Sequence, residues 1–71
     1  MHYMHYAAVT AATIQKFRQF LAEFEAEHPG VIIRHSVGFL GKNYLILATE
    51  NIGEEVRTLG IPCGVIPLPR Q

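Results

Sequence analysis

Residues 31–49, VIIRHSVGFLGKNYLILAT, decide the fold of this 71-residue chain. Two largely apolar runs, residues 31–40 and 44–49, flank a Gly-Lys-Asn sequence at residues 41–43. Glycine and asparagine tolerate the backbone conformations that tight turns between strands require. The stretch therefore predicts a β-hairpin.

Neither strand of this hairpin has a clean polar side. Side chains alternate between the two faces of a strand, and in residues 44–49 both alternating sets are largely apolar, which is typical of a central strand covered on two sides. In the second strand the sets are Tyr44, Ile46 and Ala48 against Leu45, Leu47 and Thr49. In the first strand they are Val31, Ile33, His35, Val37 and Phe39 against Ile32, Arg34, Ser36, Gly38 and Leu40.

An amphipathic helix precedes the hairpin. We expect Thr10 to cap it, with Val9 and Ile14 forming a hydrophobic staple, and residues 28–30 (His-Pro-Gly) to end it. Apolar side chains recur at helical spacing, which indicates one buried face. That stripe comprises Ile14, Phe17, Phe20, Leu21 and Phe24.

A short helix and a strand follow the hairpin. Asn51 is placed to cap the helix, Glu54 stands at the capping-box distance, and Gly60 is placed to end it. Residues 61–68 contain two prolines, which cannot donate to a sheet, so we expect a strand at the sheet edge. Residues 1–9 read as the first strand.

The resulting order over residues 1–71 predicts one small α+β domain, a ferredoxin-like split βαββαβ plait whose antiparallel sheet carries two helices on one face. The other face is then too apolar to stay in water. We expect a second copy of the chain or another protein to cover it. The expected interface residues are Met4, Tyr6, Ile32, Leu40, Tyr44, Leu45 and Leu47.

Composition narrows the function. Six basic and six acidic side chains give zero formal charge, so the cationic excess that drives phosphate-backbone binding is missing. A single cysteine allows neither an internal disulfide nor a cysteine-based zinc cluster. No apolar run approaches the roughly 20 residues of a membrane span, and no signal-peptide pattern opens the sequence. We expect a cytoplasmic protein without cofactor or metal.

Few residues are candidates for chemistry. Cys63 could act as a nucleophile, assisted by His35 or His5, although a lone cysteine is more often a small buried apolar residue. His2 and His5 lie three apart, which places them on opposite faces of a strand and argues against shared metal ligation. No paired carboxylates or glycine-rich phosphate loop are recognisable.

Residues 59–70, LGIPCGVIPLPR, carry one resemblance, which extends over residues 44–70. They are similar to the strand–helix–strand of small bacterial selenium/sulfur carrier-like domains of unknown function. In those domains the helix ends in Gly-Ile-Pro and the next strand closes in Pro-x-Pro-Arg. Their Cys-Gly pair follows the Pro-Arg, whereas Cys63 precedes it. The resemblance implies thiol or sulfur-carrier chemistry.

The leading hypothesis is a non-catalytic interaction or regulatory module that self-associates or covers a protein partner, as small bacterial or phage proteins do. A thiol-dependent enzyme or carrier using Cys63 is the alternative. Single-stranded RNA binding is a third, because aromatic side chains on plait strands can stack on bases. Its candidate residues are Tyr3, Tyr6, Phe39 and Tyr44, with Arg34, Lys42 and Arg70 as the nearby cations.

Overall fold

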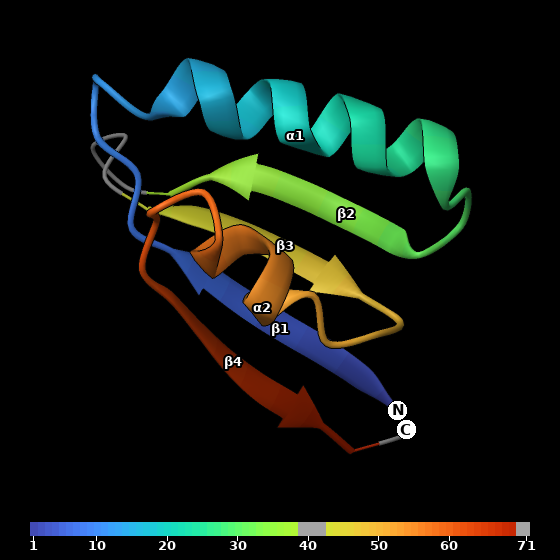
Figure 1. Ribbon diagram of the computed structural model, residues 1–71. Coiled ribbons are helices and arrows are strands. Elements are labelled where there is room, and N and C mark those ends of the chain that lie inside the picture. The colour runs from blue at the N-terminus through green and yellow to red at the C-terminus, as the bar shows by residue number, and fades with distance from the viewer. Residues whose placement is uncertain (39–42, 70–71) are drawn as a thin grey trace.

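The computed structural model describes residues 1–38 and 43–69. Its elements are β1 (His2–Ala7), α1 (Ile14–Glu27), β2 (Ile32–Val37), β3 (Tyr44–Ala48), α2 (Gly53–Arg57) and β4 (Cys63–Leu68) (Figure 1). The strands form an antiparallel sheet in the order β2-β3-β1-β4. The predicted ferredoxin-like α+β fold is confirmed, with β3 central and the proline-containing β4 at an edge.

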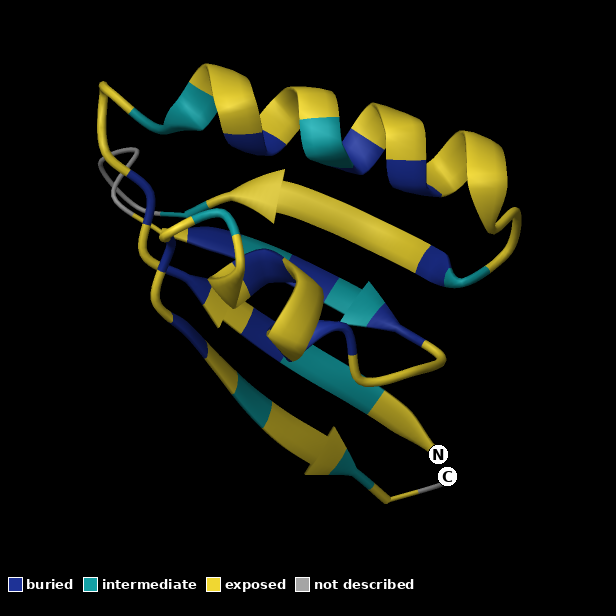
Figure 2. Ribbon diagram, viewed as in Figure 1, coloured by how far each residue is buried: buried dark blue, intermediate teal, exposed yellow. Residues whose placement is uncertain are grey.

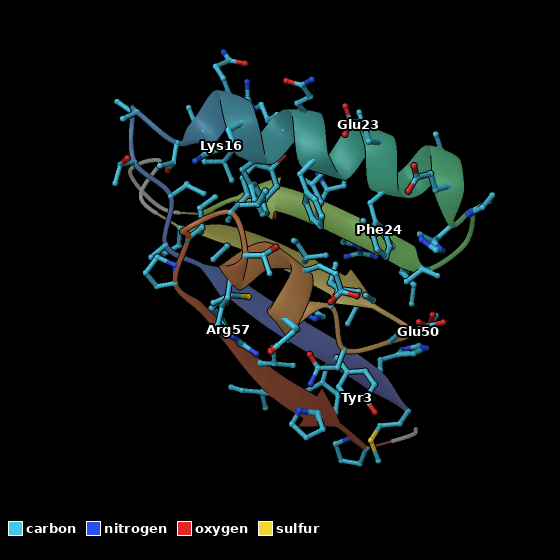
Figure 3. All side chains as sticks on the ribbon, in the orientation of Figure 1. Tyr3, Lys16, Glu23, Phe24, Glu50 and Arg57 are labelled. Atoms are coloured by element: carbon cyan, nitrogen blue, oxygen red, sulfur yellow. The ribbon has the colours of Figure 1, made fainter. Side chains whose placement is uncertain are left out.

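Both helices cover the same face of the sheet. The buried residues of α1 face the strands and its exposed residues face outward (Figure 2). Phe24 points from α1 toward the sheet, whereas Glu23 points away (Figure 3). Phe17 meets Tyr44 of β3 edge to face, with ring centroids 4.9 Å apart. The core between the layers comprises Ala7, Val9, Phe17, Leu21, Phe24, Ile32, Tyr44, Ile46, Ala48, Ile52, Val56, Ile61 and Cys63.

The first helix begins later than the sequence predicts. Thr10 caps the turn before α1 and not α1 itself, whose N-cap position is Thr13: Thr10 Oγ1 accepts a hydrogen bond from the Ala12 N–H at 3.2 Å, and the Thr10 N–H donates to Thr13 Oγ1 at 2.8 Å. Regular helix starts at Ile14. The end is as predicted: α1 stops before Pro29, and Gly30 adopts a φ of +87°.

Local signals also define α2. Asn51 Oδ1 accepts a hydrogen bond from the Gly53 N–H at 3.0 Å, and Gly60 follows the helix with a φ of +81°. Glu54 makes an ion pair with Arg57 at 4.0 Å. No helix within residues 1–38 and 43–69 is long and apolar enough to cross a membrane.

A register shift in β2 changes which side chains share a face. Ile32 pairs with Ala48, and the next pair joins Arg34 to Leu47, so Ile33 is an extra residue on the β2 side. Such a bulge reverses the alternation beyond it. Arg34 and Ile32, which strict alternation places together, therefore lie on opposite faces.

Two expected interface residues, Ile32 and Tyr44, lie on the helix side of the sheet. Ile32 is buried on the helix side beside Ala48, because the bulge reverses its face. Tyr44 is also on the helix side, where Phe17 covers its ring. Alternation within β3 could not show which of its two apolar faces met the helices. Leu40 lies outside the described residues.

Candidate interaction face

The middle of the sheet face opposite the helices is built from two cross-strand rows. Register aligns Arg34, Leu47, Met4 and Ile66 in one row and Ser36, Leu45, Tyr6 and Gly64 in the next. We call these eight residues the open face. Each row begins with a polar residue on β2 and continues with apolar residues or glycine across β3, β1 and β4.

Large apolar side chains of the open face remain accessible to solvent. Tyr6 is 44% exposed and Ile66 is 50% exposed, and Met4, Leu45 and Leu47 are partly exposed. Beside Arg34 the surface dips into a hollow of about 250 Å³. Its lining residues are Met4, Arg34, His35, Ser36, Leu45 and Leu47.

Charge is distributed unevenly between the two layers. Five of the chain's six acidic side chains belong to α1 or α2, and the sixth, Glu50, is in the turn after β3. The open face contains no acidic residue and one arginine. Two pairs of basic and acidic side chains lie within about 4 Å among the described residues, His35 with Glu25 at 3.9 Å and Arg57 with Glu54 at 4.0 Å. Arg34 is in neither pair.

His5 is a completely buried polar side chain on the helix side of β1, with 0% exposure. Its Nε2 accepts a hydrogen bond from the Ile52 N–H at 2.9 Å, so the neutral ring carries its proton on Nδ1. Nδ1 donates to the Ile46 carbonyl oxygen at 3.1 Å. Burial lowers the pKa of His5 below its usual value, although the hydrogen bond to Ile46 opposes the shift. His5 thus joins β1, β3 and the start of α2.

His35 is held on the helix side of the edge strand β2. Its Nδ1 is 3.1 Å from the Tyr44 hydroxyl, and its Nε2 is 3.9 Å from a carboxylate oxygen of Glu25. With the ring proton on Nε2, Nδ1 accepts from the tyrosine. These contacts connect β2, β3 and α1. They give His35 a structural role.

Cys63 is buried at the start of β4, beside Ala7. Burial raises the pKa of its thiol, and the nearby positive charge of Arg57 only partly offsets this. Arg57 extends from α2 toward β4 (Figure 3) and donates to the Cys63 carbonyl oxygen at 2.8 Å. A nucleophilic cysteine needs the opposite environment, one that favours the thiolate.

The structure separates the residues that thiol chemistry would combine. Cys63 and His35 lie on opposite edge strands, three strand spacings or roughly 14 Å apart. His5 lies on the strand next to Cys63, but backbone groups occupy both of its ring nitrogens. No cysteine–histidine pair is therefore formed among the described residues.

The residues considered for metal or RNA binding are likewise not brought together. His2 lies on the face opposite His5, and within residues 1–38 and 43–69 no cluster of three or more metal-ligating side chains occurs. Of the aromatic candidates, Tyr6 is on the open face, Tyr3 is on the other face, and Tyr44 is buried. Phe39, Lys42 and Arg70 lie outside the described residues.

Sequence reasoning missed four members of the open face, Arg34, Ser36, Gly64 and Ile66, and the role of His5. Gly64 and Ile66 alternate with Cys63 and Val65 in β4. Once Cys63 and Val65 are known to face the core, alternation places Gly64 and Ile66 on the open face. Comparisons of the chain with protein-family models, curated proteins and solved structures return no match.

Proposed function

We propose that this protein is a non-catalytic interaction module that self-associates through its open face. The observation that carries the proposal is the set of accessible apolar side chains opposite the helix layer, led by Tyr6 and Ile66. A contiguous apolar surface on a small domain is a feature of interaction sites. Covering it would also stabilise a domain whose core is small.

A second copy of the chain is the occupant that the charges favour. The formal net charge is zero, so no long-range repulsion opposes association of identical copies. An acidic or basic partner would find little complementary charge, because the open face contains one arginine among eight residues. Apolar contact is therefore the main interaction that the open face can make.

The size of the sheet indicates a weak dimer. Four strands spaced ~4.8 Å apart and about six residues long cover a flat area of roughly 400 Å². Two copies would bury on the order of 800 Å², below the roughly 1,200–2,000 Å² of stable specific interfaces. The dimer should therefore form and dissociate with concentration.

Sedimentation velocity with matched variants tests this proposal. Ile66→Asp places a charge on the open face, and Val37→Asp places one at an apolar site of similar exposure (41%) that pairs with Tyr44 on the helix side. Completing the burial of half-exposed Ile66 is worth about 1 kcal/mol per copy. Losing it twice weakens the dimer about 30-fold.

In the wild type and in Val37→Asp, the dimer fraction should rise as the protein concentration is increased to about 100 µM. Ile66→Asp should stay monomeric over the same range. A wild-type monomer at that concentration would refute self-association. Equal dimerisation of all three proteins would show that another surface is used.

Thiol chemistry at Cys63 is the alternative function, and it receives less support. The thiol is buried, its pKa is raised, and no base is aligned with it among the described residues. RNA binding also receives little support, because the open face contains only one aromatic ring and one cation.

A further inference from the structure

Self-association through the open face raises an electrostatic problem at Arg34. This residue begins the row that continues through Leu47 and Met4, and it lines the hollow beside them. Closing a second copy over this row would remove water from the guanidinium group. A charge that loses water without gaining a partner opposes association and so weakens a small interface.

The chain itself supplies no acidic side chain on this face. Its acidic residues are all glutamates, at positions 23, 25, 27, 50, 54 and 55. Five belong to the helix layer, and Glu50 follows the end of β3. A second copy related by symmetry presents the same open face, and therefore another arginine and no carboxylate.

We propose that the hollow beside Arg34 binds a small organic carboxylate with an apolar body, and that this ligand couples to closure of the dimer. The inference rests on the proposed self-association. Arg34 would bind the carboxylate, for which the guanidinium fork is well matched. Met4, Leu45 and Leu47 would contact the apolar body.

The hydroxyl group of Ser36 adds to the selectivity of the hollow for a carboxylate. Ser36 follows Arg34 by two residues on the same face of β2, about 7 Å along the strand, so its hydroxyl is placed to donate to a ligand oxygen. One guanidinium and one hydroxyl suit a single negative charge. Inorganic phosphate, which is more strongly charged and has no apolar part, would gain nothing from the leucines.

The hollow limits the size of the ligand. Its volume of about 250 Å³ lies just below the range of roughly 300–1,000 Å³ that is common for small-molecule sites. An aliphatic or aromatic monocarboxylate such as hexanoate or benzoate is therefore a suitable probe. The neutral amides hexanamide and benzamide have nearly the same shape and lack the charge.

The measurement is the dimer dissociation constant with and without about 10 mM probe. A ligand that binds each copy of the closed dimer with an affinity near 1 mM, and does not bind the monomer, stabilises the dimer by about elevenfold per site, or roughly 100-fold for two sites. Hexanoate or benzoate should produce this tightening in the wild type. The amides and inorganic phosphate should produce little.

Variants separate this inference from the proposed function. Arg34→Leu should dimerise more tightly than the wild type without any probe and should not respond to it. Arg18→Leu removes the same charge from the exposed side of α1 and should behave like the wild type. Dimers of wild type and Arg34→Leu that are equally tight and insensitive to carboxylate would overturn the ligand site and leave self-association intact.

Direct binding gives an independent readout. In NMR titrations, hexanoate should shift the methyl signals of Leu45 and Leu47 in the wild type and not in Arg34→Leu. Equal shifts with hexanamide would overturn the proposed carboxylate specificity. If neither wild type nor Arg34→Leu associates at any concentration, the proposed function itself fails.

Discussion

Acidification should destabilise this domain through His5. Folding keeps the buried ring neutral, with Nε2 accepting from the Ile52 N–H and Nδ1 donating to Ile46. Protonation would place an N–H against the Ile52 N–H and a charge in the core. The pKa of His5 in the folded protein is lowered, chiefly by burial. Below about pH 6.5 the unfolded chain therefore binds a proton that the folded chain does not.

The direction and the upper limit of this loss of stability follow from the difference in proton binding between the folded and unfolded chains. The stability contributed by neutral His5 is fully present above the unfolded pKa of about 6.5. It is lost as the pH falls toward the lowered pKa of the folded state, at up to about 1.4 kcal/mol per pH unit. For a domain of this size that is a substantial share of the free energy of unfolding.

Urea unfolding between about pH 8 and pH 5.5, followed by circular dichroism, measures this dependence. His5→Phe removes the titrating group and leaves the Ile52 N–H without its side-chain acceptor. It should cost about 1–3 kcal/mol at high pH and flatten the pH dependence. His2→Gln, which alters an exposed histidine, should keep the wild-type slope. A His5→Phe variant with the wild-type slope would refute the reasoning.

Three further outcomes are expected. Cys63 should react with iodoacetamide at neutral pH only slowly in the folded protein and rapidly in urea, and fast labelling of the folded protein would support thiol chemistry instead. Phe17→Ala should lower the free energy of unfolding by about 3–5 kcal/mol, because the ring is fully buried against Tyr44. Gly60→Ala should cost about 1–2 kcal/mol, because φ is +81° while nothing lies within 4 Å of the added Cβ. Urea unfolding measures both losses, and a neutral Gly60→Ala would contradict the left-handed conformation.

Signals that act over a few residues predicted the fold well. The apolar spacing of α1 identified Phe17, Leu21 and Phe24 as its buried set. Gly60 closes the turn that follows α2, in the left-handed conformation that favours glycine after a helix. The prolines of β4 indicated an edge strand, and the sheet order agrees.

Features that depend on long-range pairing could not be predicted. The bulge at Ile33 moved Ile32 to the core, and alternation in one strand contains no sign of such an insertion. His5 finds its partners 41 and 47 residues away, at Ile46 and Ile52. Nothing near His5 in the sequence identifies them. The open face was therefore predicted as a feature, with Met4, Tyr6, Leu45 and Leu47 among its members. Its other members were known only after the register was known.

Intermolecular contacts across the open face would test the central claim most directly. In a mixed sample of isotope-labelled and unlabelled protein at about 1 mM, isotope-filtered NMR detects only contacts between copies. We predict contacts from the methyl groups of Met4, Leu45 and Leu47 in one copy to open-face side chains in the other. Intermolecular contacts that involve α1 instead, or none at that concentration, would contradict self-association through the open face.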